Sequence, residues 1–333
     1  MQPRLPFLQM LRRGGRAALL LGLAVLLAAC SALPSLATPT ATPTITPTAT
    51  PSPTATPTPT ATPTPQPLTL TLRLEPEAVF QGQLATLAIE ASRPAFLAAT
   101  LGDHPLPLFE EAGHWYGLVP IWAGAAAGSL PLTITATDPL GGPDAHEQRN
   151  LTIVACDFPI DYVVLEPAVL ALLSDQEAVR AENDLLERVL APRTPTRLWQ
   201  EPFLRPVPGE VTTLYGQRRS YNGGPASSYH DGLDLGIAAG LPVAASAAGK
   251  VVFAGPLTVR GNAVIIDHGW GLYSGYYHMS QVDVQAGQDV ARGQTVGLVG
   301  STGLSTGPHV HWQTWIDGQP IDPTFLEQWQ LPS

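Results

Sequence analysis

The segment Gly307-Pro-His-Val-His311 places two histidines two residues apart, directly after a Gly-Pro turn. Side chains alternate between the two faces of a β-strand, so His309 and His311 would point to the same face. Four further segments are typical of strands because they are rich in β-branched or aromatic residues and are separated by glycine-rich turns. They are residues 243–252, 263–266, 271–278 and 295–299. We therefore expect an all-β domain over residues 201–333, with the reactive side chains at strand ends and turns.

Two other segments of this region add residues of the same chemical kind. Tyr229-His-Asp-Gly-Leu-Asp234 contributes His230 and Asp234, and Gly275-Tyr-Tyr-His-Met279 contributes His278. Two neutral imidazoles and one carboxylate form a catalytic type of zinc site, which keeps one position open for a water whose pKa falls to about 7. The five residues therefore supply three zinc ligands and two further imidazoles.

Residues 203–322 carry an ordered series of motifs that resembles the lysostaphin-type, or LytM-like, peptidoglycan endopeptidases. The series comprises Tyr215-Gly216 with Arg218, His230-x-Gly-x-Asp234, Gly240-x-Pro-Val243, Gly261-Asn262, His268-Gly269, Tyr277-His278-Met279, Gly300-Ser-Thr-Gly303, Ser305-Thr-Gly-Pro-His309-Val-His311 and Asp322-Pro323. A single His-x-His motif would be a weak signal, whereas this series covers roughly 120 residues in the order of the family.

The resemblance implies a fold, a cofactor and a role for each of the five residues. The fold would be the antiparallel β domain of this family, a duplicated hybrid motif. His230, Asp234 and His311 would bind one Zn²⁺ ion per chain, and His278 and His309 would be the catalytic histidines. The substrate would be a peptide of peptidoglycan, either a cross-link or a stem peptide. Which of the two histidines is the general base, and which bond is cleaved, stay open.

Several neighbouring residues have less specific interpretations. We expect His268 to be structural, and Asp231 and Asp267 to be ordinary carboxylates at a turn and a strand end. Tyr229 and Tyr277 adjoin site residues and are expected to line a groove. Gln313 and Ser274 stand where many relatives carry Glu and Thr, which could alter the hydrogen bonds that surround the metal ligands.

The N-terminus has the pattern of an export signal. Arg12, Arg13 and Arg16 precede an apolar stretch over residues 17–29, and Leu27-Ala-Ala-Cys30 resembles the bacterial lipobox. This predicts a lipoprotein signal peptide over residues 1–29 and a lipid on Cys30 that holds the protein at the membrane, outside the cytoplasm. A plain secretory signal and an uncleaved helix are the alternatives. Cys156, the only other cysteine, is expected to be a buried apolar residue without a catalytic role.

Three further regions separate the export signal from the domain with the histidines. Residues 30–67 are rich in Thr, Pro and Ala, which predicts a disordered, semi-rigid stalk. Residues 68–155 contain short alternating segments that predict an immunoglobulin-like β-sandwich, serving as a spacer, a substrate-positioning module or a lid. Residues 156–200 form a connector, in which Ser174-Asp-Gln-Glu177 resembles a capping box and Val179, Glu182, Leu186, Val189 and Leu190 keep a helical period.

The composition excludes some functions and leaves alternatives open. The chain has 17 Lys and Arg against 27 Asp and Glu, a net charge of -10, and no basic face that would bind nucleic acid. The oligomeric state is unknown. The main alternative to a peptidase is a non-catalytic protein that binds the wall and activates another murein hydrolase. A zinc peptidase that acts on glycine-rich proteins is the second alternative.

Overall fold

The computed structural model describes residues 66–331 of the 333-residue chain. The predicted signal peptide, the predicted lipid site at Cys30 and residues 30–65 of the predicted stalk lie outside the described residues. Within the described part of the chain, no helix is both long and apolar enough to cross a membrane.

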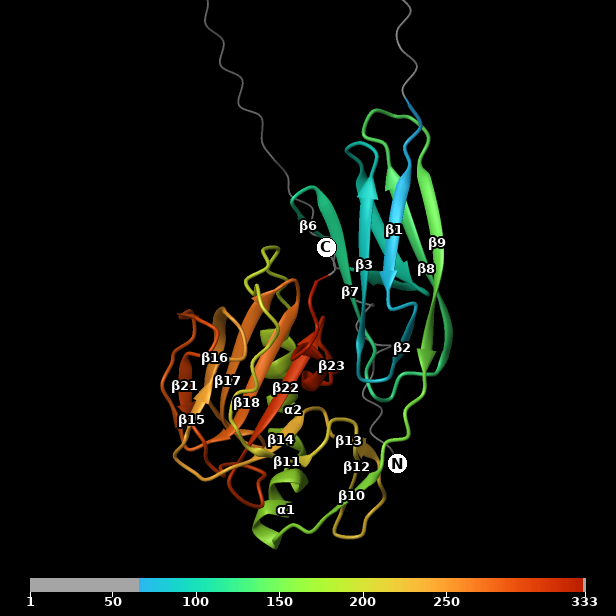
Figure 1. Ribbon diagram of the computed structural model, residues 1–333. Coiled ribbons are helices and arrows are strands. Elements are labelled where there is room, and N and C mark those ends of the chain that lie inside the picture. The colour runs from blue at the N-terminus through green and yellow to red at the C-terminus, as the bar shows by residue number, and fades with distance from the viewer. Residues whose placement is uncertain (1–65, 332–333) are drawn as a thin grey trace, which may run out of the picture. The chain divides into compact units, whose positions relative to one another are not determined.

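The first folded region consists of two β-sheets that enclose a common core (Figure 1). Leu87 and Ile89 from one sheet pack with Leu132 and Ile134 from the other, and all four are almost fully buried. The predicted β-sandwich is confirmed, while its immunoglobulin-like character stays a prediction. One sheet has the order β1 (Leu70–Glu75), β3 (Leu84–Ala91), β7 (His114–Pro120) and β6 (Phe109–Glu111). The other has the order β2 (Ala78–Phe80), β9 (Ala145–Val154), β8 (Gly128–Thr137), β4 (Phe96–Leu101) and β5 (His104–Leu106).

The connector contains two helices where one was expected. After β10 (Ile160–Val163), α1 spans Pro167–Ser174 and α2 spans Gln176–Leu190. Ser174 ends α1, and the N-cap of α2 is Asp175, whose side chain accepts a hydrogen bond from the Ala178 N–H at 3.0 Å. The N-cap therefore lies one residue later than the sequence pattern predicts. Ser and Asp are comparable N-caps, and they stand side by side here.

The second folded region is built on one eight-stranded sheet, in which β23 (Gln319–Ile321) pairs only with β22 (Figure 1). The other strands follow the order β11 (Glu210–Thr213), β14 (Leu233–Gly236), β22 (His309–Ile316), β18 (Leu272–Met279), β17 (Gly261–Gly269), β16 (Gly249–Leu257) and β20 (Asp289–Val290). Smaller strands and a final helix complete the region. These are β12 (Arg218–Tyr221), β13 (Ser228–Tyr229), β15 (Pro242–Ala244), β19 (Gln281–Val282), β21 (Thr295–Leu298) and α3 (Pro323–Leu326). The predicted all-β architecture is confirmed.

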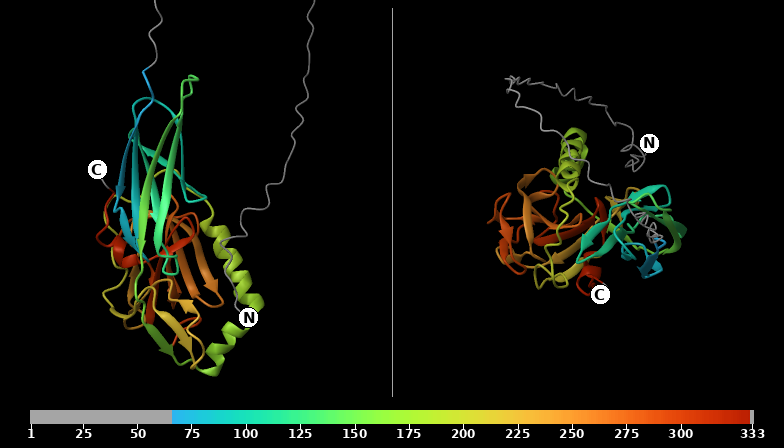
Figure 2. Two further views of the ribbon diagram at one scale, coloured as in Figure 1. Left: turned by 90° about the vertical axis from the view of Figure 1, so that its right-hand side faces the viewer. Right: turned by 90° about the horizontal axis from the view of Figure 1, so that it is seen from above.

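Helix α2 covers one face of this sheet, as Figure 2 shows. Leu186 and Leu190 of the helix pack with Tyr273 and Tyr277 of β18 and with Trp315 of β22. Side chains of the opposite face, such as Tyr276 and Trp312, belong to a separate and larger core. Both faces of the sheet are therefore covered over most of their extent.

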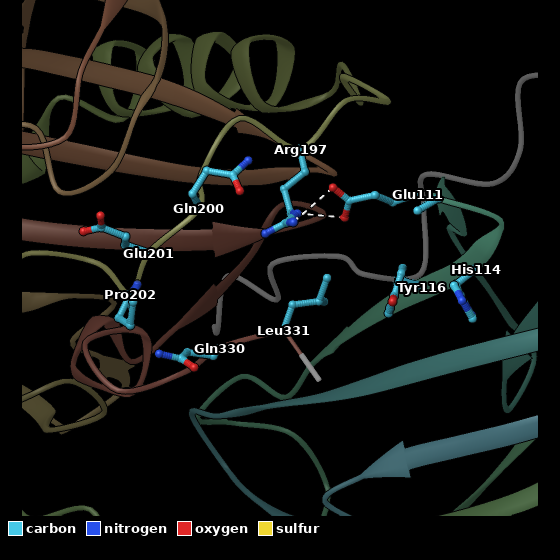
Figure 3. A pocket seen from close by; sticks show the side chains of 10 residues that line it. Glu111, His114, Tyr116, Arg197, Gln200, Glu201, Pro202, Gln330 and Leu331 are labelled. Atoms are coloured by element: carbon cyan, nitrogen blue, oxygen red, sulfur yellow. Dashed lines mark hydrogen bonds and ion pairs between the residues drawn. The ribbon is translucent and has the colours of Figure 1, made fainter. Parts of the chain in front are cut away.

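The sandwich and the second region share part of that larger core, and both belong to one compact unit. Phe109 and Tyr116 stack on Trp270 at ring-centroid distances of 5.6 and 5.5 Å, and Arg197 forms two hydrogen bonds with Glu111 at 2.9 and 3.0 Å. Figure 3 shows this ion pair at the wall of a cavity of roughly 490 Å³. None of the five candidate site residues lines that cavity. We therefore assign it to the contact between the two regions.

Candidate metal centre

Two neighbouring strands bring Asp234 and His311 together. Asp234 of β14 lies directly opposite His311 of β22 in the antiparallel register, so their side chains share one face. His230 comes from the segment between β13 and β14. The Nε2 atom of His230 lies 3.1 Å from Asp234 Oδ1 and 3.0 Å from His311 Nδ1, and the last two atoms are 2.7 Å apart. All three side chains are buried.

The close approach of the loop to His311 depends on Gly232. A Cβ atom at this position would lie 2.5 Å from the carbonyl oxygen of Trp312 and 2.6 Å from His311 Nε2. Both distances are shorter than real Cβ contacts, so any larger residue would push the loop and His230 away from β22. This explains the glycine between His230 and Asp234.

Further hydrogen bonds fix which atom each ligand candidate presents. His230 Nδ1 donates to the Leu214 carbonyl at 2.9 Å, so its Nε2 carries the lone pair that points into the cluster. Asp234 Oδ2 accepts a hydrogen bond from Arg219 Nη2 at 2.6 Å, which leaves Oδ1 for the cluster. Ligands held in this way by outer partners are typical of metal sites in proteins.

The donor set fits a small divalent cation. In a tetrahedral zinc site with Zn–N bonds of about 2.0–2.1 Å, ligand atoms lie about 3.3 Å apart, close to the separations in this cluster. Burial raises the pKa of Asp234, but the neighbouring imidazoles of His230 and His311 outweigh it and hold the pKa well below its usual range. Burial lowers the pKa of His230. An ionised carboxylate and a neutral imidazole are the forms that bind metal. Within residues 66–331, this is the one group of three or more histidine, cysteine or carboxylate side chains arranged to hold a metal ion.

His311 gives the cluster a testable dependence on pH. Burial lowers the pKa of His311, whereas hydrogen bonds to Asp231 and Asp234 outweigh it and raise the pKa to about 9. Without a cation the imidazole therefore keeps its second proton up to that pH, and a cation must displace it. We expect zinc binding at pH 7 to release about one proton, and the apparent affinity to rise about tenfold per pH unit until about pH 9. Calorimetric titrations in buffers of different ionisation enthalpy measure the released protons. A binding enthalpy that does not vary between buffers would contradict this expectation.

The other two histidines lie beside the cluster. The imidazole rings of His278 and His309 are 4.7 Å apart, and the rings of His278 and His311 are 6.2 Å apart. His309 Nε2 lies 3.9 Å from Asp234 Oδ1. The structure thus brings together all five residues that the sequence selects.

His278 reaches this position through a bulge in β18. The pairing register of β17 and β18 shifts by one residue next to His278. The φ of His278, 61°, lies in the left-handed region. Regular alternation would turn His278 away from Tyr277, toward the opposite face of the sheet. The extra residue instead keeps His278 beside His309, and Met279 returns to the core of the opposite face. Irregular backbone of this kind is typical of functional sites.

Both outer imidazoles are held as neutral bases. His278 Nδ1 donates to the Thr302 carbonyl at 2.7 Å, and His309 Nδ1 donates to the Gly307 carbonyl at 2.8 Å. Each Nε2 therefore carries a lone pair. Burial lowers the pKa of His309. Burial, together with the nearby His309 and His311, lowers the pKa of His278 to about 3. At neutral pH both side chains can accept a proton.

The less specific interpretations have mixed outcomes. His268 is fully buried and bonds to the Ala248 carbonyl and to Ser274 Oγ, which agrees with a structural role. The prediction that Tyr277 lines a groove is wrong, because its side chain is fully buried behind His311. Tyr229 is partly exposed and packs edge-on against Trp122 and Phe158.

Cys156 is only partly buried, with Sγ 3.5 Å from the Gln81 carbonyl oxygen. Burial raises the pKa of its thiol, so it lacks the property of a reactive nucleophile. The three histidines of the sandwich, His104, His114 and His146, are not part of any metal-binding group in the described chain.

Three charged residues at the site have no role in the sequence interpretation. Arg219 bonds to Asp234, Asp231 contacts His311, and Arg260 lies 3.5 Å from Asp231. Asp231 was expected to be an ordinary turn carboxylate. Its position one residue after His230 was the available signal, whereas nothing in the sequence singled out Arg219 or Arg260.

Comparison with known proteins decides the family of this domain. Residues 228–323 match Peptidase family M23. These residues form an M23 peptidase domain. The match contains every one of the five site residues, and it confirms the resemblance to lysostaphin-type peptidases.

Curated relatives of the M23 domain are named as peptidases. DD-carboxypeptidase/endopeptidase Mpg of Neisseria meningitidis is 46% identical over 97 residues, which are 29% of this chain and 22% of that protein. Peptidoglycan DD-endopeptidase ShyA of Vibrio cholerae is 41% identical over 93 residues, 28% of this chain and 22% of that protein. The chain thus spans about a fifth of the length of these relatives.

The similarity to one solved structure extends over more of the chain than the M23 domain alone. A putative M23 peptidase from Pseudomonas aeruginosa has a TM-score of 0.55 and 25% identity, covering 74% of this chain and 94% of the other. Because the M23 match is much shorter, the similarity must include part of the fold that precedes it.

Proposed function

We propose that the chain is a zinc-dependent endopeptidase that hydrolyses peptide cross-links or stem peptides of bacterial peptidoglycan. The observation that carries this proposal is the convergence of three metal-ligand atoms beside two neutral imidazoles in an M23 domain. The name of the curated relative ShyA, a peptidoglycan DD-endopeptidase, supports peptidoglycan as the substrate.

His230 Nε2, Asp234 Oδ1 and His311 Nδ1 would hold the zinc ion. When bound, zinc polarises the scissile carbonyl and lowers the pKa of a coordinated water to about 7. Arg219 keeps Asp234 oriented through Oδ2, and the Leu214 carbonyl keeps His230 in the correct tautomer.

His278 and His309 would move protons. The free Nε2 of one imidazole accepts the proton of the attacking water. The other stabilises the developing negative charge or protonates the leaving amine. Their hydrogen bonds to the carbonyls of Thr302 and Gly307 prevent the rings from turning the wrong nitrogen toward the substrate.

We further propose that the protein is exported and anchored outside the cytoplasmic membrane by a lipid on Cys30. The lipobox-like segment Leu27-Ala-Ala-Cys30 and the Thr/Pro-rich stalk support this location.

Purified protein should release defined muropeptides from isolated peptidoglycan. We expect mass spectrometry to show new peptide ends at one type of bond, a chelator to stop the release, and added Zn²⁺ to restore it. Zinc-loaded protein that leaves peptidoglycan of several chemistries uncut would contradict the proposal and favour a wall-binding regulator. Cleavage of a pentaglycine peptide without cleavage of wall fragments would favour a peptidase for glycine-rich proteins.

A further inference from the structure

Helix α2 carries a buried carboxylate on the face that packs against the eight-stranded sheet. Glu182 is only 5% exposed and lies one turn before Leu186 on the same stripe. Its side chain accepts hydrogen bonds from the Val259 N–H at 2.7 Å, from the Arg260 N–H at 3.3 Å and from Arg260 Nη1 at 2.9 Å. A buried charge needs such partners, so Glu182 ties α2 to the segment between β16 and β17.

Arg260 continues this connection in two directions. Its Nη2 lies 3.5 Å from Asp231 Oδ2, and its guanidinium carbon lies 5.6 Å from the centroid of the Tyr277 ring. Its backbone carbonyl accepts a hydrogen bond from the N–H of His278 at 3.0 Å. The side chain thus faces the metal cluster, while the backbone supports the bulge that orients His278.

Asp231 completes the path to the metal cluster. Its Oδ1 lies 3.5 Å from His311 Nε2, the ring nitrogen that does not face Asp234. A carboxylate beside the outer nitrogen of a metal-binding histidine fixes the ring orientation and tautomer and makes the inner nitrogen a stronger ligand. Arg260 holds the second oxygen of Asp231, so this carboxylate cannot turn freely.

We propose that Glu182, Arg260 and Asp231 form a positioning network through which helix α2 orients both His311 and His278. Glu182 fixes Arg260 from outside the M23 match. Arg260 then places Asp231 against His311 by its side chain and holds His278 by its carbonyl. The effect on His278 rests on the proposed function, whereas the effect on His311 concerns metal binding alone.

The test compares three variants of the full chain with a matched control. Asp231→Asn keeps the size of the side chain and removes its charge, and Glu182→Gln does the same on α2. Arg260→Lys keeps a charge but cannot contact Glu182 and Asp231 with a fork of N–H groups. Glu187→Gln, on the exposed face of α2, is the control because it removes the same charge from the same helix.

We expect zinc affinity, measured by competition with a chromophoric chelator, to fall roughly 10- to 100-fold in Asp231→Asn and to fall in the same direction in Glu182→Gln and Arg260→Lys. Glu182→Gln should also lower kcat more than it changes KM, and Co²⁺-loaded variants should show shifted absorption bands. Glu187→Gln should match the wild type in every measurement.

Unchanged zinc affinity and Co²⁺ spectra in Asp231→Asn and Glu182→Gln would overturn the proposal. If Glu182→Gln does not fold, Asp231→Asn decides alone, because its side chain is 39% exposed and its loss removes no buried contact of the core. Failure of the proposed function is distinguishable from these outcomes, since a protein that cuts no peptidoglycan would still reveal the network through its zinc affinity.

Discussion

His311→Ala should abolish stoichiometric zinc binding and lower the rate of peptidoglycan hydrolysis by at least about 10³-fold. The substitution removes one of three converging ligand atoms, and two remaining ligands hold zinc far less tightly. A bound metal contributes several kcal/mol to stabilisation of the transition state, and each 1.36 kcal/mol corresponds to a factor of ten in rate. Metal analysis after dialysis and muropeptide release measure the two effects.

His311 is a better choice for this experiment than Asp234. Asp234 also binds Arg219, which is largely buried, so its removal would leave that charge with the more distant carboxylate of Asp161, at 3.8 Å, and reduce the stability of the fold. The control is His146→Ala, which removes an exposed imidazole from β9 of the sandwich. A His311→Ala protein that keeps one tightly bound zinc and normal turnover would show that the ligand set is wrong.

Substitution of His278 or His309 should lower kcat by about 10²- to 10⁴-fold while the protein still binds about one zinc ion. Neither imidazole belongs to the three-ligand cluster, and both carry a free Nε2 that can accept a proton. At position 309 we choose Ala. At position 278 we prefer Asn, because Asn tolerates the left-handed φ of 61° better than Ala does.

The decisive comparison is between zinc content and turnover in the same preparations. Loss of turnover with zinc retained would support a role in proton transfer, and loss of both would place the residue among the metal ligands. Normal turnover in both variants would exclude the proposed acid–base roles. Because the two side chains have different outer partners, Thr302 and Gly307, unequal losses are expected.

The grouping of the candidate site residues can be predicted from the sequence because these residues are concentrated in short motifs. His309 and His311 are two residues apart on a strand, and His230 and Asp234 are separated by three residues, one of them Gly232. In each case a local rule of side-chain direction or chain flexibility limits the possible geometry. The all-β architecture follows in the same way from short alternating segments and glycine-rich turns.

The supporting residues could not be predicted with the same rules. Glu182, Asp231 and Arg260 are far apart in the chain and meet only after α2 packs on the sheet. Glu182 occupies an apolar position of the helical period. This signal is ambiguous, because a carboxylate there can either be buried in an ion pair or lie at the edge of the apolar stripe of the helix. The neutral state of His278 likewise depends on burial, which no local pattern specifies.

The bulge at His278 limits how this domain can change in length during evolution. Loss of the extra residue of the bulge would restore regular alternation and turn His278 toward the opposite, apolar face of the sheet, away from His309. Loops elsewhere in the domain can vary without such a reversal. Among related sequences, the spacing from the β17–β18 turn to His278 should therefore be fixed even where the identities of the intervening residues differ.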